Sequence, residues 1–273
     1  LDTLMHGLNK LEYRGYDSAG VALIGPRRSV EVCKREGHIE NLAEALESRT
    51  PEGTVGVGHT RWSTHGPPTD ENAHPHTDCD GGVAVVHNGI IENYGELKAD
   101  LQRRGHEFTS ETDTEVVPHL VEDALRGGAD PEAAVRSAVG RLEGSYAVAV
   151  VIAGVDRIFA ARNDSPLVLG IDDDAYYLAS DVPAFRDHTD RVVYLDDGEF
   201  TVLGPDGWRV TTLAGEPVEK RVDTVDWDPE ETGKSGYDHF MLKEIHEQPR
   251  ALRQCLRGRV DELAGTVDIG DLG

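Results

Sequence analysis

The sequence predicts an α+β fold built in layers, with mainly antiparallel sheets. Segments of strand character come first, amphipathic helices occupy the middle, and strands return in the second half. That order is typical of sheets packed against segregated helices. No G-x-G-x-x-G or Walker A segment is present, which excludes the nucleotide-binding folds that these motifs mark. A length of 273 residues allows one large domain, or one domain and part of another.

The first half of the chain is expected to begin with a helix, because apolar residues recur at helical spacing from Leu1 to Leu11. Four short apolar strands are expected at Val21–Ile24, Val30–Cys33, Val55–His59 and Val83–His87. Four further helices are expected at Ile39–Leu46, Glu92–Arg104, Thr114–Arg126 and Pro131–Leu142. The last of these has Asp130 as its expected N-cap and Pro131 in its first turn.

From Tyr146 onward the pattern is that of strands joined by turns. Seven strands are expected at Tyr146–Ile152, Arg157–Ala161, Leu167–Leu169, Ala175–Leu178, Val192–Leu195, Phe200–Leu203 and Trp208–Thr212. The run Gly204-Pro205-Asp206-Gly207 predicts a hairpin turn between the last two. An acidic loop at Asp223–Thr232 and a helix at His239–Arg257 follow. We therefore expect one domain over residues 1–222, and a linker with a helix over 223–273.

The charge balance excludes some partners. The chain has 51 acidic and 27 basic residues, a formal net charge of −24, and such a surface repels nucleic acid and anionic membranes. No apolar run approaches the roughly 20 residues of a membrane span. Cys33, Cys79 and Cys255 are odd in number and widely spaced, so no disulfide framework is expected and a cytoplasmic location is predicted.

The excess of acid leaves two interpretations open. Either the chain is disordered, or it folds in a high-salt cytoplasm where ions screen its self-repulsion. The well-formed apolar strands favour a folded chain, and only six of the basic residues are lysine. A salt-loving host is therefore predicted, with an ordinary acidic protein as the alternative.

Four polar segments interrupt the apolar elements and carry the candidate site residues: 12–20, 59–66 with 72–76, 87–93 and 110–115. Arg61 directly follows a strand, and its planar guanidinium suits a carboxylate held by two hydrogen bonds. The alternative is a surface ion pair. Trp62, between an arginine and a serine in a loop, fits the wall of a pocket better than a core.

Asn88 and Gly89 follow an apolar strand, where a side-chain amide beside a backbone N–H can form an oxyanion hole. An Asn-Gly turn is the equally weighted alternative. Asp113 precedes a helix, so composition alone favours an N-cap. Its functional interpretation is a carboxylate that binds an ammonium group.

Five histidines fall within 29 residues, at His59, His65, His74, His76 and His87. A metal site is the rival explanation of this cluster. The spacing contains neither an H-x-x-x-H helix motif nor a pair of cysteines, so no metal and no cofactor is expected. Thr64, Asn72 and His74 are expected to line a polar pocket instead.

Taken together, these segments resemble the class II glutamine amidotransferases, N-terminal-nucleophile hydrolases that release ammonia from glutamine. E-Y-R-G-Y-D-S-A-G, H-T-R-W-S-T-H-G, N-A-H-P-H, H-N-G-I-I-E-N and S-E-T-D-T-E-V occur in the order and approximate spacing of that family. Within it, the glucosamine-6-phosphate synthases are the better match because of Tyr13, Tyr16, Trp62 and the segment Lys243–Pro249. The resemblance covers essentially the whole chain.

The resemblance implies a four-layer α/β/β/α sandwich and a role for each matching residue. An N-terminal Cys attacks the glutamine amide, with its own α-amine as general base. Asn88 and Gly89 match the oxyanion hole, Arg61 the clamp for the glutamine α-carboxylate, and Asp113 the partner of its α-ammonium. Trp62 matches a residue that closes the ammonia route. The remaining glutamine-pocket positions are Thr64, His65 and His74.

The same resemblance implies the partners. Glutamine is the substrate of residues 1–222, and the ammonia passes to fructose 6-phosphate in sugar-isomerising domains outside this chain, which also form a homodimer. The family begins with a Cys-Gly-Ile strand, which we expect to precede Leu1, since both ends look cut. Without that strand, the chain as printed is expected to be inactive.

Three alternatives stay open. The chain resembles, more distantly, a purine-pathway phosphoribosyl amidotransferase or an asparagine-forming amidotransferase, and a non-catalytic glutamine-sensing module would use the same pocket. The sequence beyond Gly273 would separate the enzymes. The residue that precedes the first strand would identify a sensor, which need not begin with Cys.

The acidic surface predicts salt-dependent stability. Between ~0.1 M and molar KCl the Debye length shrinks from about 10 Å to about 3 Å, so the repulsion between like charges weakens. The midpoint of thermal unfolding should therefore rise through a KCl series, measured by circular dichroism. A flat response would contradict the prediction of a high-salt host.

Overall fold

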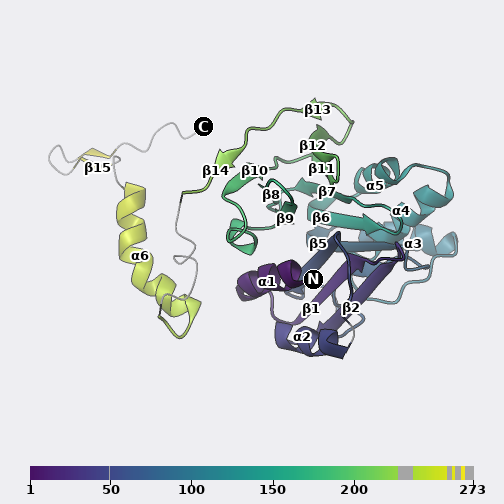
Figure 1. Cartoon of the computed structure of the whole chain (residues 1–273), viewed down its shortest axis with the longest axis horizontal. Coiled ribbons are helices and arrows are strands. Elements are labelled where there is room, and N and C mark those ends of the chain that lie inside the picture. The colour runs from purple at the N-terminus through teal and green to yellow at the C-terminus, as the bar shows by residue number, and fades with distance from the viewer. Residues whose placement is uncertain (49, 227–235, 257–259, 262–265, 268–273) are drawn as a thin grey trace. The chain divides into compact units, whose positions relative to one another are not determined.

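The chain divides into two compact units, residues 1–226 and 227–273 (Figure 1). Its computed structural model describes residues 1–48, 50–226, 236–256, 260–261 and 266–267. In the second unit these include helix α6 (Phe240–Leu256) and a hairpin of β15 (Val260–Asp261) and β16 (Thr266–Val267). The expected loop at 223–232 lies outside the described residues from 227 onward, as does Arg257 of the expected last helix.

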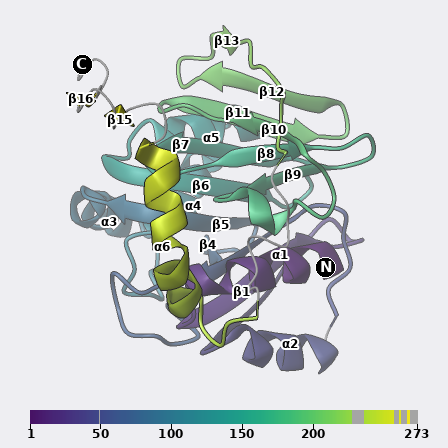
Figure 2. The same ribbon diagram turned by 90° about the vertical axis from the view of Figure 1, so that its left-hand side faces the viewer.

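The first unit is organised around a seven-stranded antiparallel sheet. Figure 2 shows its strands one above another in the order β13-β12-β11-β7-β6-β5-β4. In that order they are Pro217–Val218, Gly207–Thr212, Glu199–Gly204, Ile158–Asn163, Gly144–Ile152, Val83–Ile91 and His76–Thr77. Strand β7 is central, β5 lies next to the edge strand β4, and β5 and β6 pair with each other along their whole length.

Two smaller antiparallel sheets form the second β layer. One has the order β2-β1-β3, with β2 at Val30–Glu36, β1 at Ser18–Ile24 and β3 at Gly56–Arg61. The other has the order β14-β10-β8-β9, at Asp223–Thr224, Arg191–Tyr194, Val168–Ile171 and Tyr176–Ala179. Apolar residues of both sheets pack into one core against the seven-stranded sheet, so the two together make one layer.

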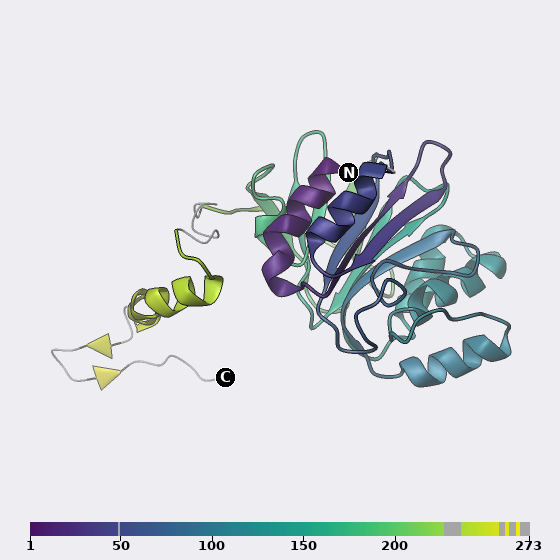
Figure 3. The same cartoon turned by 90° about the horizontal axis from the view of Figure 1, so that it is seen from below.

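Helices cover the two outer faces, and Figure 3 shows them on opposite sides of the strands. On one side, α1 (Asp2–Leu11) and α2 (Ile39–Ser48) pack against β1 through Leu8 and Leu42. On the other side lie α3 (Tyr94–Arg103), α4 (Val116–Arg126) and α5 (Pro131–Val139), packed on the seven-stranded sheet. Short 3₁₀ turns occur at Glu12–Arg14 and Val182–Ala184.

Alternation along the strands explains why two cores form. Successive side chains of a strand point to opposite faces, so Val83 and Val85 of β5 join the helix-covered core. Ala84 and Val86 join the core between the two β layers. The expected four-layer α/β/β/α sandwich with mainly antiparallel sheets is confirmed.

Most expected elements are present within a few residues, and two local alternatives are wrong. Strand β5 continues to Ile91, so Asn88-Gly89 is not a turn. Helix α4 has Glu115 at its N-cap position, so Asp113 does not cap it. The Asp130 cap is confirmed, with Ala133 N donating to Asp130 Oδ1 at 3.1 Å.

The short strands β4 and β13 were not expected, because two residues carry no alternation. In the described part of the chain, no helix has both the length and the apolar character needed to cross a membrane.

Candidate active site

Of the nine residues expected at the site, Asn72 does not line the cavity, because its side chain is hydrogen-bonded to Pro67 O and Glu111 N, and the other eight line one cavity of about 730 Å³ in the first unit. They are Arg61, Trp62, Thr64, His65, His74, Asn88, Gly89 and Asp113. They come from the end of β3, the loop that follows it, strand β5 and the segment before α4. Residues as far apart in sequence as Arg61 and Asp113 thus supply one pocket.

Asn88 is oriented by a neighbouring histidine. Its Oδ1 lies 2.9 Å from His59 Nε2 on β3, and an amide oxygen can only accept, so that nitrogen carries the proton. The other end of the amide, Nδ2, is therefore left as a donor. Burial lowers the pKa of His59 to about 4, against the effect of its bond to Asn88, so the imidazole is neutral near pH 7.

Gly89 occupies a position that no other residue fits. Its φ is +123°, and an added Cβ would lie 2.1 Å from the Ser145 carbonyl oxygen of the adjacent strand. Gly is the one residue that takes such a φ at no steric cost. Strand β5 can therefore stay paired with β6 here while Asn88 lines the cavity.

Arg61 is 4% exposed at the end of β3. Its guanidinium donates to the carbonyl oxygens of the following loop, at His65, at Gly66 (3.3 Å) and at Pro67 (3.4 Å). Asp17 Oδ1 lies 3.7 Å from Nη1. Arg61 thus shapes the loop that carries Thr64 and His65, and it also contributes to the cavity wall.

Asp113 is 3% exposed and is tied to β5, since Ile91 N donates to its Oδ2 at 2.7 Å. Its Oδ1 has only one hydrogen bond with the described residues, a long one of 3.5 Å from the Thr114 hydroxyl. The carboxylate is thus fixed through one oxygen, and the other remains able to accept from a ligand.

A chain of neutral polar groups backs this wall. His87 N donates to His74 Nδ1 at 3.3 Å, so His74 Nε2 carries the proton and faces Thr114 Oγ1 at 3.4 Å. That hydroxyl lies 2.8 Å from His87 Nδ1. Burial lowers the pKa of both histidines, and for His74 the charges of His59 and His76 add to this effect.

The outer rim is more open. Trp62 is 62% exposed and meets the Tyr16 ring edge-on, with centroids 5.4 Å apart. His65 packs edge-on against Tyr94 at 5.4 Å, and its Nδ1 lies 3.3 Å from Thr64 Oγ1. These three predicted residues therefore lie where a loop could close over a ligand.

Sequence reasoning missed several lining or supporting residues. Asp17 holds Ser63 N as well as facing Arg61, and Ser165, Thr112 and Thr114 line the cavity. Asp17 stood in a recognised polar segment, but no local signal pointed to Ser165. The partner of His59 lies 29 residues away, so no short motif could reveal it.

The cavity also runs along two unpaired strand edges. Every residue of β3 and of β9 lines it. Among the described strands, β3 pairs only with β1 and β9 pairs only with β8. Two backbone edges of one layer therefore face the same space.

The sequence was compared with known proteins. The glutamine amidotransferase domain family matches residues 59–187. Glutamine–fructose-6-phosphate aminotransferases of Symbiobacterium thermophilum and Halobacterium salinarum are each 54% identical, over 100% and 96% of this chain. The chain spans only 44% and 43% of those relatives. A solved glutamine phosphoribosylpyrophosphate amidotransferase from B. subtilis has a TM-score of 0.67 and 26% identity, covering 79% of this chain and 47% of its own.

Residues 59–187 thus match the glutamine amidotransferase domain family, and the first unit has the fold of the class II glutamine amidotransferases. Within that class, its relatives at about half identity over nearly its whole length are the glutamine–fructose-6-phosphate aminotransferases.

The buried histidines predict a loss of stability on mild acidification. Burial holds the pKa of His59, His74, His76 and His87 below the ordinary value. The unfolded chain therefore takes up protons first as pH falls below about 6.5. Between this pH and the pKa of the folded state, each histidine should lower the free energy of unfolding by about 1.4 kcal/mol per pH unit. For His59 the folded pKa is about 4.

Urea unfolding between pH 7 and pH 5 measures this slope, in a window above that of the carboxylates. His76→Gln should reduce the slope, since it removes one such group. The matched control His188→Gln, at an exposed position of the same unit, should leave it unchanged. Equal slopes for the two variants would contradict the assignment.

Proposed function

We propose that this chain is the glutaminase part of an enzyme that hydrolyses glutamine and delivers the ammonia to fructose 6-phosphate, giving glucosamine 6-phosphate. The observation that carries the proposal is the identity of 54% to a glutamine–fructose-6-phosphate aminotransferase over the full chain. Residues 1–222 are assigned to glutamine, and 223–273 to a linker and helix. Because the chain spans about 44% of that relative, the sugar site and a homodimer contact are assigned to regions outside it, in a cytoplasmic protein.

Glutamine binding is assigned to the two charged ends of the cavity wall. Arg61 is proposed to hold the α-carboxylate with N–H groups that the loop carbonyls leave available. Asp113 is proposed to accept from the α-ammonium through Oδ1, whose one hydrogen bond with the described residues is the long one from Thr114. Thr64, His65, His74 and Trp62 complete the pocket, with Trp62 at its rim.

The oxyanion is assigned to Asn88 and Gly89. When a thiolate adds to the amide carbon, the carbonyl oxygen gains a negative charge that preorganised donors stabilise. Asn88 Nδ2 is such a donor, because His59 occupies the other end of the amide. The N–H of Gly89 is proposed as the second. Collapse of the intermediate then releases ammonia and leaves a thioester, which water hydrolyses to glutamate.

The nucleophile is assigned to a Cys-Gly-Ile strand that precedes Leu1. The unpaired edges of β3 and β9 along the cavity support this, because one more strand between them would satisfy both. Such a strand would bring its first residue to the cavity that holds Asn88. Its Cys thiol would attack, and its free α-amine would take the thiol proton.

The alternatives receive less support. The phosphoribosyl amidotransferase from B. subtilis shares the fold at 26% identity, against 54% for the aminotransferase relative. A glutamine-sensing module would keep Arg61 and Asp113, and would not need the oxyanion pair.

Substitutions at the two kinds of residue should separate binding from chemistry in the complete enzyme. Arg61→Ala and Asp113→Ala each remove a charge-assisted contact worth roughly 1.5–3 kcal/mol, so KM for glutamine should rise roughly 10- to 150-fold. Asn88→Ala should instead lower kcat by about 10²–10³. Steady-state ammonia release measures both constants.

Two variants serve as controls. Asp113→Asn keeps an acceptor for Ile91 N and loses only the charge, so it should still raise KM. Asn9→Ala removes an exposed amide on α1 and should change neither constant. An unchanged KM in the Arg61 and Asp113 variants would remove their assigned roles, and an unchanged kcat in Asn88→Ala would remove the oxyanion role of Asn88. A complete protein that binds glutamine and releases no ammonia would be the sensing module.

The assigned nucleophile predicts that a chain starting at Leu1 releases no ammonia. Addition of an N-terminal Cys-Gly-Ile strand should restore release and create a single site for a thiol-alkylating glutamine analogue, on the new Cys. One further residue in front of that Cys should abolish activity, since the free α-amine is lost. Robust turnover by the chain that starts at Leu1 would overturn this mechanism.

A further inference from the structure

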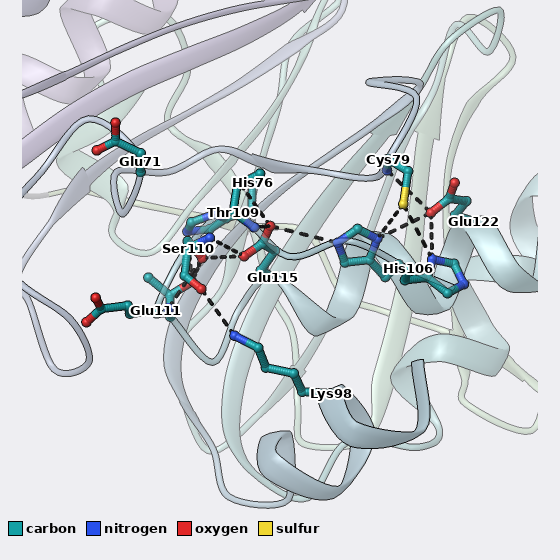
Figure 4. A network of polar contacts seen from close by, with 12 residues as sticks. Glu71, His76, Cys79, Lys98, His106, Thr109, Ser110, Glu111, Glu115 and Glu122 are labelled. Carbon is teal, nitrogen blue, oxygen red and sulfur yellow. Dashed lines mark hydrogen bonds and ion pairs between the residues drawn. The ribbon is translucent and has the colours of Figure 1, made fainter. Parts of the chain in front are cut away.

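A second polar cluster lies apart from the glutamine cavity. Figure 4 shows Cys79, His106 and Glu122 around one point, and His119 completes the group. Cys79 lies between β4 and β5, His106 follows α3, and His119 and Glu122 are i and i+3 on α4. None of the four lines the glutamine cavity.

The four candidate ligand atoms lie within 4.8 Å of one another. Cys79 Sγ is 3.7 Å from His106 Nδ1 and 3.6 Å from His119 Nδ1. Glu122 Oε2 is 2.9 Å and 3.2 Å from the same two nitrogens. In tetrahedral zinc sites the Zn–S bond is about 2.3 Å and the Zn–N or Zn–O bond about 2.0–2.1 Å. These bonds place a sulfur and a nitrogen ligand about 3.6 Å apart, and a nitrogen and an oxygen ligand about 3.3 Å apart. The four ligand-to-ligand distances given above match these values within about 0.4 Å.

The remaining ring nitrogens face carboxylates. His106 Nε2 lies 3.7 Å from Asp123 Oδ1, and His119 Nε2 lies 3.8 Å from Glu115 Oε1. Metal-binding histidines usually direct their second N–H at such a group, which leaves the first nitrogen free to bind the ion. Both Nδ1 atoms point to the common centre, so both rings have this orientation.

Burial and charge also suit an ion. The side chains of His106, His119 and Glu122 are 1%, 1% and 3% exposed, while Cys79 is exposed and leaves a route from solvent. A thiolate and a carboxylate together carry the charge opposite to that of a divalent cation, and Arg126 Nη2, 2.5 Å from Glu122 Oε1, leaves Glu122 Oε2 for the ion. By contrast, the group Glu12, His38 and Glu40 lacks a thiol and has two exposed members.

We propose that Cys79, His106, His119 and Glu122 bind one zinc ion, or another thiophilic divalent cation, at a structural site. Four protein ligands close the coordination shell, which is the pattern of structural rather than catalytic zinc. On binding, the Cys79 thiol gives its proton to solvent and each histidine binds through Nδ1. The ion would join the loop before β5, the segment after α3 and helix α4.

The test is metal binding by the complete protein. The protein is stripped with a chelator under reducing conditions, and separate metal-free samples are titrated with Zn²⁺ and with Co²⁺. One equivalent of Zn²⁺ should bind and raise the thermal midpoint. Co²⁺ should show the absorption of a tetrahedral site with a sulfur-to-cobalt charge-transfer band. Cys79→Ser should remove that band and weaken Zn²⁺ binding by more than about 100-fold, and Asp123→Asn should weaken it about 10- to 100-fold.

Cys33→Ser, on β2, is the matched control and should leave both signals unchanged. Circular dichroism of Cys79→Ser should match the parent, since the replaced side chain is small and exposed. Failure of the parent to bind stoichiometric Zn²⁺ would overturn the proposal. So would a charge-transfer band that survives in Cys79→Ser or disappears in Cys33→Ser.

Discussion

The pairing of β5 with β6 over nine residues is the constraint on which the site depends. The two faces of β5 contribute to both cores of the unit. Its far end carries Asn88 and Gly89, and Ile91 N holds Asp113. A side chain at Gly89 would meet the Ser145 carbonyl and push the strand away. One close backbone approach therefore maintains both the sandwich and the positions of the proposed oxyanion donors.

Several of the buried polar side chains around β5 are neutral histidines. His59, His74 and His87 are buried, and burial lowers the pKa of each. Neutral imidazoles can both donate and accept, so His74 and His87 share the Thr114 hydroxyl without the desolvation penalty of an ion. Charged side chains near them include Arg61 and the acids Asp17 and Asp113. This distribution suits a zwitterionic ligand with one carboxylate and one ammonium.

Local sequence predicted the elements well, and it left undecided what depends on distant contacts. Alternation and helical spacing located the layers because side-chain direction follows directly from backbone geometry. Asn88-Gly89 could have been a turn, and only its pairing with Tyr146 and Ala147 on β6 decides otherwise. Asp113 had the local pattern of an N-cap, yet its partner is Ile91 N. Likewise, Cys79 meets histidines 27 and 40 residues away, a spacing that no short motif describes.

Helix α4 and the segment before it connect the two sites through buried hydrogen bonds. Glu115, which faces His119, accepts from Thr109 N and from Ser110 N, both at 2.7 Å. Burial raises the pKa of Glu115, but the adjacent His119 ring and hydrogen bonds from Ser110 and Thr109 outweigh this and lower the pKa below the ordinary value, so Glu115 stays ionised and holds the segment firmly. Ser110 Oγ lies 3.0 Å from Thr112 Oγ1, and that hydroxyl lies 3.0 Å from His76 Nε2 (Figure 4).

Thr112 and Asp113 line the glutamine cavity directly after this network. An ion bound to His119 would therefore order Asp113, the carboxylate assigned to the substrate ammonium, although the ion itself would lie outside the cavity. The effect would be on glutamine binding rather than on bond cleavage, because Asn88 and Gly89 are positioned by β5 and His59 instead. Binding and chemistry thus depend on two separate supports, α4 with its preceding segment for the first and the central sheet for the second.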